Sequence, residues 1–133
     1  MIVRYVQGEV LGFISFDDVV LANGITVSDQ AFIEIESKST LALDGIFGMS
    51  FTAISAMHKT SVIDNLLAQN ALQPPIFSFY LGNDKQHNEL TWGGYDPSKF
   101  VGELNFAPLQ GQQWTIALDG VRFGTFSSNQ SSK

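Results

Sequence analysis

The 133-residue sequence contains no cysteine, which excludes thiol catalysis, cysteine-based zinc sites and disulfide bonds. It has no run of Lys or Arg, and its net charge of −6 argues against nucleic-acid binding through phosphate contacts. No apolar stretch approaches the ~18 residues of a spanning helix. Met1–Arg4 has neither the charge nor the apolar stretch that begins a signal peptide, so none is expected there.

The residues that are present indicate a β-rich fold. Hydrophobic residues make up 44% and charged residues 15% of the chain, which excludes a disordered or coiled-coil composition. The 11 Phe and 12 Gly favour strands joined by tight turns.

The first third of the chain has the pattern of a long β-hairpin over residues 9–36. Asn23–Gly24 lies between two apolar runs and accepts positive φ at both centres of a type I′ turn. Gly12 predicts a bulge or a close backbone approach. Either Phe32 or Ile33 is expected to face inward, depending on register.

One helix is predicted near the middle of the chain. Ser61–Asp64 fits a variant of the capping box, and an apolar stripe at helical spacing follows: Val62, Ile63, Leu66 and Leu67. Pro74–Pro75 is expected to end this helix, and a shorter turn is expected near residues 55–59. Strands are predicted at 76–81, 89–92, 99–108, 113–118 and 121–126, with the polar segment 82–88 as an internal boundary.

Three groups of motifs follow one another along the chain. The first is Tyr5–Gly12 followed by Phe16–Val19, and the second is Asp44–Met49 followed by Val62–Leu66. The third runs through Phe77–Leu81, Leu90–Asp96 and Trp114–Asp119. In this order they resemble the pepsin family of aspartic proteases. That family carries a Tyr-Gly-Thr-Gly flap, Asp-Gly-Ile-Leu-Gly-Leu, Val-x-Asn-Leu, Phe-Ser-x-Tyr-Leu, Gly-Gly-x-Asp and Tyr-Trp-x-Ile at corresponding places.

The resemblance implies a mainly β, pepsin-like acid protease fold. This fold is a bilobal antiparallel β-barrel architecture with one or two short helices and an active cleft between the lobes. Residues 1–82 would form the second half of the N-terminal lobe, with the flap, the Asp-Gly-Ile-Phe-Gly loop and the helix. Residues 83–133 would begin the C-terminal lobe and the sheet that joins the lobes.

The catalytic motif of the family is missing from this sequence. Aspartic proteolysis needs two carboxylates that share one proton, so that one aspartate stays protonated while the other activates water. Each lobe supplies its aspartate in Asp-Thr-Gly or Asp-Ser-Gly, and neither tripeptide occurs here. By the resemblance, the first aspartate would lie before Met1 and the second beyond Lys133. No catalytic residue is therefore expected within the chain, and the chain alone is expected to be inactive.

Other acidic and basic side chains are poor substitutes for the missing pair. Asp44 corresponds to a structural aspartate next to the catalytic loop of the family. Asp17 and Asp18 are neighbours on a strand, so their side chains point to opposite faces. His58 and His87 lie in polar or small-residue surroundings without a nucleophile motif. No spacing typical of metal ligands is found, and no cofactor is expected.

The resemblance leaves a peptide-binding surface. Tyr5 matches the flap tyrosine that closes over substrate, although an edge-strand tyrosine is the alternative. Gly8 and Glu9 would offer flap backbone groups to an extended peptide.

Further candidates would line the pockets of the cleft. Leu43, Ile46 and Ile54 would line apolar subsites beside the cleaved bond, and Gln113 would lie on the leaving side. An ordinary core role for these residues stays open. Val6 replaces the flap-tip glycine of the family, which leaves the mobility of the flap open.

The expected function is therefore a portion of an aspartic-type endopeptidase that supplies flap and pockets. A non-catalytic pepsin-like protein that binds peptides or inhibitors is the alternative, and an unrelated β-rich domain is a third reading. The expected partners are a peptide or protein substrate and either the missing halves of the protease or another copy of the chain. The resemblance implies a secretory, lysosomal or vacuolar location. Asn129, in Asn129–Ser131, is a candidate glycosylation site.

Overall fold

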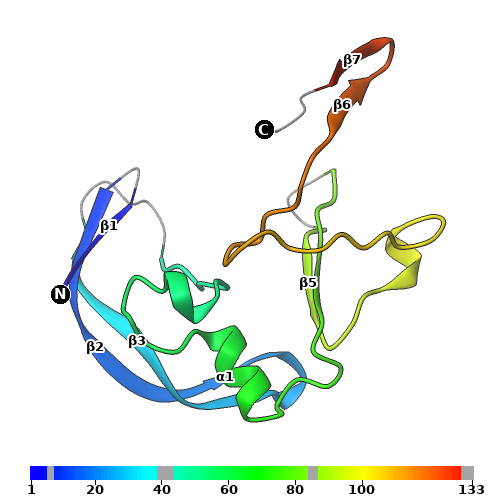
Figure 1. The fold of residues 1–133 in the computed structure, drawn as a ribbon. Coiled ribbons are helices and arrows are strands. Elements are labelled where there is room, and N and C mark those ends of the chain that lie inside the picture. The colour runs from blue at the N-terminus through cyan, green and yellow to red at the C-terminus, as the bar shows by residue number, and fades with distance from the viewer. Residues whose placement is uncertain (6–7, 39–43, 84–86, 130–133) are drawn as a thin grey trace. The chain divides into compact units, whose positions relative to one another are not determined.

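The computed structural model describes residues 1–5, 8–38, 44–83 and 87–129. The fold is mainly β, as predicted, and the described residues include one α-helix (Figure 1). Its elements are β1 (Ile2–Tyr5), β2 (Gly8–Val20), β3 (Thr26–Lys38), α1 (Val62–Ala68), β4 (Phe77–Tyr80), β5 (Glu89–Trp92), β6 (Gly120–Phe123) and β7 (Phe126–Asn129), with short 3-10 turns η1 (Ala22–Gly24), η2 (Thr52–Ile54) and η3 (Pro97–Lys99). The chain divides into two compact units, Met1–Gly102 and Glu103–Lys133.

The first unit is built around an antiparallel sheet in the order β1-β2-β3. The turn between β2 and β3 has φ of 59° at Asn23 and 73° at Gly24, and the Ile25 N–H donates to the Ala22 carbonyl oxygen at 3.4 Å. Positive φ at both central residues is the signature of the type I′ turn that matches strand twist. The prediction for the hairpin and its turn is confirmed.

Two irregularities bend this hairpin. The register shifts between Leu11 and Gly12, where a Cβ added to Gly12 would lie 2.0 Å from the carbonyl oxygen of Glu34. Both the bulge and the close approach predicted for Gly12 are therefore present. The register shifts a second time between Asp17 and Val19 of β2. On the facing part of β3, Asp29 has φ of 53°. The Asp18 carboxylate accepts the Asp29 N–H at 3.1 Å, which satisfies a donor that the bulge removes from the ladder.

Strand alternation is less regular than the sequence pattern suggests. Phe32 and Ile33 are both half-buried, and which of them faces inward stays a prediction. Ala31 is buried beside Gln30, whose side chain is 5% exposed. The bulge at Asp29 and the docking of α1 on this stretch explain why two adjacent residues are covered.

Helix α1 begins where the sequence predicts. The Ser61 hydroxyl accepts the Asp64 N–H at 3.2 Å, as a capping box requires. The helix ends at Ala68, before the predicted stop at Pro74–Pro75. Asn70 has φ of 52°, and the end is closed by two bonds, from Ala71 N–H to Leu66 O at 2.9 Å and from Asn70 N–H to Leu67 O at 3.1 Å. This is a Schellman motif with Asn at the left-handed position, so the prolines are not what stops the helix.

The core of the first unit lies between α1 and β3. Leu66 and Val27 are fully buried and belong to one apolar cluster with Val62, Ile63 and Leu72. Leu67, predicted for the same stripe, is 43% exposed. Figure 1 shows α1 on the inner side of the curved β2–β3 hairpin. Burying side chains of this size stabilises the contact by about 1.5–3 kcal/mol each.

Amide side chains fix the same contact by hydrogen bonds. Asn65 Nδ2 donates to Gln30 Oε1 at 2.9 Å, and Gln30 Nε2 donates to the carbonyl oxygen of Thr60 at 3.2 Å. Gln69 clamps Ser28, accepting its N–H and donating to its carbonyl oxygen, both at 2.9 Å. Because these bonds are directional, they set the position of α1 along β3 as well as its distance from it.

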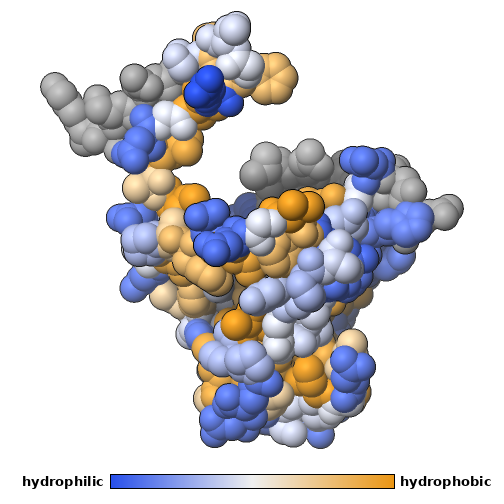
Figure 2. Space-filling model, turned by 90° about the vertical axis from the view of Figure 1, so that its right-hand side faces the viewer, coloured by the Kyte–Doolittle hydropathy of each residue, from blue (hydrophilic) through white to orange (hydrophobic). Residues whose placement is uncertain are grey.

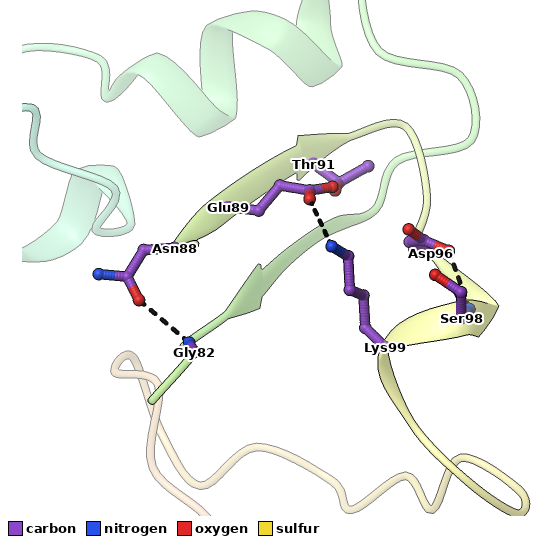
Figure 3. A network of polar contacts seen from close by, with 7 residues as sticks. All are labelled: Gly82, Asn88, Glu89, Thr91, Asp96, Ser98 and Lys99. Carbon is purple, nitrogen blue, oxygen red and sulfur yellow. Dashed lines mark hydrogen bonds and ion pairs between the residues drawn. The ribbon is translucent and has the colours of Figure 1, made fainter. Parts of the chain in front are cut away.

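Strands β4 and β5 form a separate two-stranded sheet, with Phe77 opposite Trp92 and Tyr80 opposite Glu89. Their ends and the turn after β5 carry the polar contacts drawn in Figure 3. Lys99 Nζ reaches Glu89 Oε2 at 3.2 Å and lies 4.8 Å from the ring centre of Tyr80. Asp96 Oδ1 accepts the Ser98 N–H at 2.8 Å and caps η3.

The second unit differs most from the sequence prediction. Strands expected at 99–108 and 113–118 are absent from the described residues, which have a single bridge there, between Leu109 and Ile116. The segment 121–126 is the hairpin of β6 and β7, which reverses at Gly124. All residues from 101 to 127 are exposed. A strand pattern needs a paired neighbour and a covered face, and neither is available for these stretches within the unit.

We predict that Gly12→Ala destabilises the protein by roughly 1–3 kcal/mol, because the added methyl group meets backbone that cannot move without shifting β3. Urea unfolding followed by circular dichroism measures the effect. Gly94→Ala is the matched control, since a Cβ at Gly94 meets nothing within 4 Å. Equal stability of the two variants would show that the close approach at Gly12 is not tight.

A second prediction concerns acid stability. Hydrogen bonds from the Thr52 hydroxyl, then the Thr52 N–H, lower the pKa of Asp64 from its ordinary value of 3.8. The stabilisation from this carboxylate is therefore present above pH 3.8 and is lost as pH falls through the lower folded pKa. Asp64→Asn should flatten the fall in melting temperature below that pH. An unchanged pH profile would contradict this.

Candidate functional site

The hairpin of β1 and β2 is the first element of the candidate site. Tyr5 lies opposite Gly8 and Arg4 opposite Glu9, so the two strands are joined by a two-residue connection. Arg4 Nε lies 3.5 Å from Glu9 Oε2, an exposed ion pair across the hairpin. Val6, at the expected flap tip, and the side chain of Tyr5 lie outside what the structure describes.

Gly8 and Glu9 stand at the start of β2. They pair with β1, whereas the described pairing of β2 with β3 begins one residue later, at Val10 opposite Lys38. β1 pairs with Gly8–Leu11 of β2, and β3 pairs with β2 over the described range Val10–Val20, so Val10 and Leu11 have a neighbour on both sides.

The loop after Asp44 carries the candidate pocket residues. Ile46 is 53% exposed and Ile54 is 44% exposed in the described chain. Phe47 packs edge-on against Trp92 of β5, with ring centres 6.3 Å apart. Leu43 lies outside the described residues. Whether Ile46 and Ile54 line subsites or belong to a core stays a prediction.

Ile54 is held on a short turn, η2, whose hydrogen bonds run from Ile54 N–H to Phe51 O and from Ser55 N–H to Thr52 O at 3.1 and 3.0 Å. Asp64 Oδ2 accepts the Thr52 N–H at 2.9 Å. The sequence identified Asp64 as a capping residue only. Thr52 and Asp64 are 12 residues apart, and no local sequence pattern indicates a hydrogen bond between them.

Gln113 belongs to the second unit, in a tight reversal. The Gln110 N–H donates to the Thr115 carbonyl oxygen, and the Thr115 hydroxyl donates to the Gln110 carbonyl oxygen, both at 2.8 Å. Gly111 has φ of 71° in this turn, and Gln113 is exposed. Asn129 is the last residue of β7, and its side chain lies outside the described part.

The carboxylates weighed as substitutes for a catalytic pair have separate surroundings. Asp17 Oδ1 accepts the Asp18 N–H at 2.7 Å, and Asp18 Oδ1 accepts the Asp29 N–H. Both carboxylates therefore bind backbone N–H groups at the register shift between β2 and β3. Asp44 is exposed at the start of its loop. Within the described ranges, no group of three or more His, Asp or Glu side chains is placed to hold a metal ion. In the same ranges, the helices are too short or too polar to cross a membrane.

Comparison with known proteins matches the whole chain. The family model described as eukaryotic aspartyl protease matches residues 1–133. Cathepsin E from Mus musculus is 42% identical over 131 residues, which cover 92% of this chain and 33% of the relative. Cathepsin E from Rattus norvegicus is 41% identical, with the same coverage of each chain. Probable vacuolar protease A from Arthroderma benhamiae is 34% identical over 131 residues, covering 92% of this chain and 32% of the relative.

The chain thus spans about a third of the length of the curated relatives it matches. The match across all 133 residues and the motifs in the expected order agree with the mainly β fold. The chain belongs to the eukaryotic aspartyl protease family.

Proposed function

We propose that this chain is a portion of an aspartic-type endopeptidase and supplies its flap and part of its substrate pockets. The family match over residues 1–133 carries the proposal. The β1–β2 hairpin supports it, since Tyr5 ends one strand directly opposite Gly8, where the resemblance places the flap. A flap needs this form, because it must lie over a bound peptide while its base stays fixed.

The two catalytic aspartates would come from segments outside residues 1–133. The sequence contains neither Asp-Thr-Gly nor Asp-Ser-Gly. Hydrolysis of this type requires one ionised and one protonated carboxylate held together, so that water is activated between them. Asp17 and Asp18 are already engaged with backbone N–H groups, which supports the view that the chain alone is inactive.

The flap would bind substrate mainly through its backbone. By the resemblance, Gly8 and Glu9 at the start of β2 would offer backbone groups to an extended peptide, which would add as a strand. Tyr5 would place its ring over a substrate side chain and its hydroxyl within reach of a hydrogen bond.

The exposed apolar residues Ile46 and Ile54 would form walls of pockets beside the cleaved bond. Leu43 would join them from the same loop, and Gln113 would contribute a polar wall on the leaving side. These assignments follow the resemblance residue by residue. The exposure of both isoleucines supports them, because a pocket wall must be reachable by a ligand.

Large apolar residues elsewhere need cover, and the missing portions of the protease would provide it. Leu81 is 77%, Phe106 is 86% and Phe123 is 84% exposed. Figure 2 shows apolar surface spread over the visible face. Residues 1–82 would complete the N-terminal lobe and residues 83–133 would begin the C-terminal lobe. Without those portions, another copy of the chain would cover these surfaces, since exposed patches of this kind drive association.

An acidic compartment of the vacuolar or endo-lysosomal kind is the proposed location. One relative is named a probable vacuolar protease and others are cathepsin E. A secretory route would agree with glycosylation at Asn129, which lies at the end of an exposed hairpin.

The test is to join this chain to the flanking segments of mouse cathepsin E, each with its aspartate, and to measure cleavage of a peptide at acid pH. We predict activity with both aspartates and a loss of at least roughly a thousandfold when either is Asn. Peptide binding without cleavage in the joined protein would instead favour the non-catalytic binding protein.

In the joined protease, Tyr5→Phe should lower kcat/KM by roughly two- to tenfold, because one hydrogen bond to substrate is lost. Tyr5→Ala should lower it further, since ring packing is lost as well. Arg4→Ala on the same strand is the control. Its exposed ion pair with Glu9 should contribute little, so activity should change less than twofold. Equal effects of the Tyr5 and Arg4 variants would remove Tyr5 from the site.

A further inference from the structure

A closed ring of hydrogen bonds ties the turn that carries Ile54 to the first turn of α1. The Thr52 N–H donates to Asp64 Oδ2 at 2.9 Å, the Ser61 N–H donates to Thr52 Oγ1 at 2.9 Å, and the Asp64 N–H donates to Ser61 Oγ at 3.2 Å. Each of the three residues gives its backbone N–H and accepts with its side chain. Ser61 is buried, at 7% exposed, and Thr52 and Asp64 are partly buried, so the ring is partly shielded from competing water.

Capping of the helix does not require this ring. The bond from Asp64 N–H to Ser61 Oγ caps α1 by itself. The other two bonds reach Thr52, nine and twelve residues away, and add nothing to the intrahelical bonds. Their effect is to fix a surface turn to a helix that is itself anchored on β3 through Leu66 and Asn65.

The turn passes this constraint to Ile54. Thr52 is the first residue of η2, and Ile54 is the last. With Ile54 N–H bonded to Phe51 and Ser55 N–H bonded to Thr52, the turn has little freedom once Thr52 is fixed. The direction of the exposed Ile54 side chain is therefore set by a carboxylate ten residues further along the chain.

We infer that Asp64 is a positioning residue that sets the apolar side-chain preference of the pocket to which Ile54 contributes. This rests on the proposed function, because Ile54 is a pocket wall only within a peptidase cleft. Asp64 touches no substrate in this assignment and acts through Thr52. The lowered pKa of Asp64, caused first by the Thr52 hydroxyl, keeps the acceptor ionised in mildly acid solution.

The test uses the joined protease defined above and two peptides that differ only by Leu or Ala at a residue beside the cleaved bond. The readout is the ratio of kcat/KM for the two peptides, which a uniform loss of folded enzyme does not change. Ile54→Ala reports whether the pocket uses Ile54. Asp64→Ala should lower the Leu-over-Ala ratio by about three- to tenfold, and Asp64→Asn, which keeps an oxygen acceptor, should restore part of it.

Thr52→Pro provides a second, independent break of the ring. It removes the N–H donor and the hydroxyl, and proline suits the first position of a helical turn. Phe51, with φ of −73° and ψ of 152°, already has the extended conformation that a residue before proline prefers. Thr52→Pro should lower the ratio as Asp64→Ala does, and the double variant should go no further, because both remove one connection.

Asp96→Ala is the matched control, since Asp96 caps another 3-10 turn through the Ser98 N–H and should leave the ratio unchanged. The inference is overturned if Ile54→Ala lowers the ratio while Asp64→Ala and Thr52→Pro behave like Asp96→Ala; the proposed function then stands. An unchanged ratio in Ile54→Ala removes Ile54 from the pocket and the inference with it. If thermal unfolding shows that Asp64→Ala does not fold, Thr52→Pro decides alone.

Discussion

The packing of α1 on β3 is the contact on which the rest of the first unit depends. Leu66 and Val27 are both fully buried in one apolar cluster. Truncating a buried side chain of this kind lowers the free energy of unfolding by about 2–5 kcal/mol. The amide bonds from Asn65 and Gln69 convert this non-directional burial into a defined position. Two sets of contacts connect α1 and β3 to the candidate site. Asp64 of α1 binds the turn that carries Ile54, and β3 pairs with β2, which pairs with β1.

The long hairpin of β2 and β3 is fixed at two places. Its turn at Asn23–Gly24 matches the twist of the strands, and the close approach at Gly12 holds β2 against Glu34 of β3. β1 joins this hairpin along Gly8–Leu11, at the end of β2 that leads to the two-residue connection with Tyr5.

Features determined by neighbouring residues could be read from the sequence. The Asn23–Gly24 turn, the Gly12 bulge, the Ser61 cap and strand β5 all follow from local backbone chemistry. The strands expected at 99–108 and 113–118 do not form in the described chain, because a strand needs a paired neighbour and the described residues there have a single bridge, between Leu109 and Ile116. The helix ends at Ala68, well before Pro74, since the left-handed Asn70 closes it as glycine would. The family assignment was available from motif order, whereas the tie from Asp64 to Thr52 depends on contacts distant in sequence.

In the proposed function this chain supplies a flap and pocket walls but no catalytic pair, and the carboxylates of Asp17, Asp18 and Asp64 accept backbone N–H groups. Peptide cleavage by the purified 133-residue chain alone, at acid pH and with or without a statine-type inhibitor, tests this most directly. No cleavage above the buffer rate is the result the account predicts. Cleavage that the inhibitor blocks would contradict it, because a catalytic carboxylate pair would then lie within these residues.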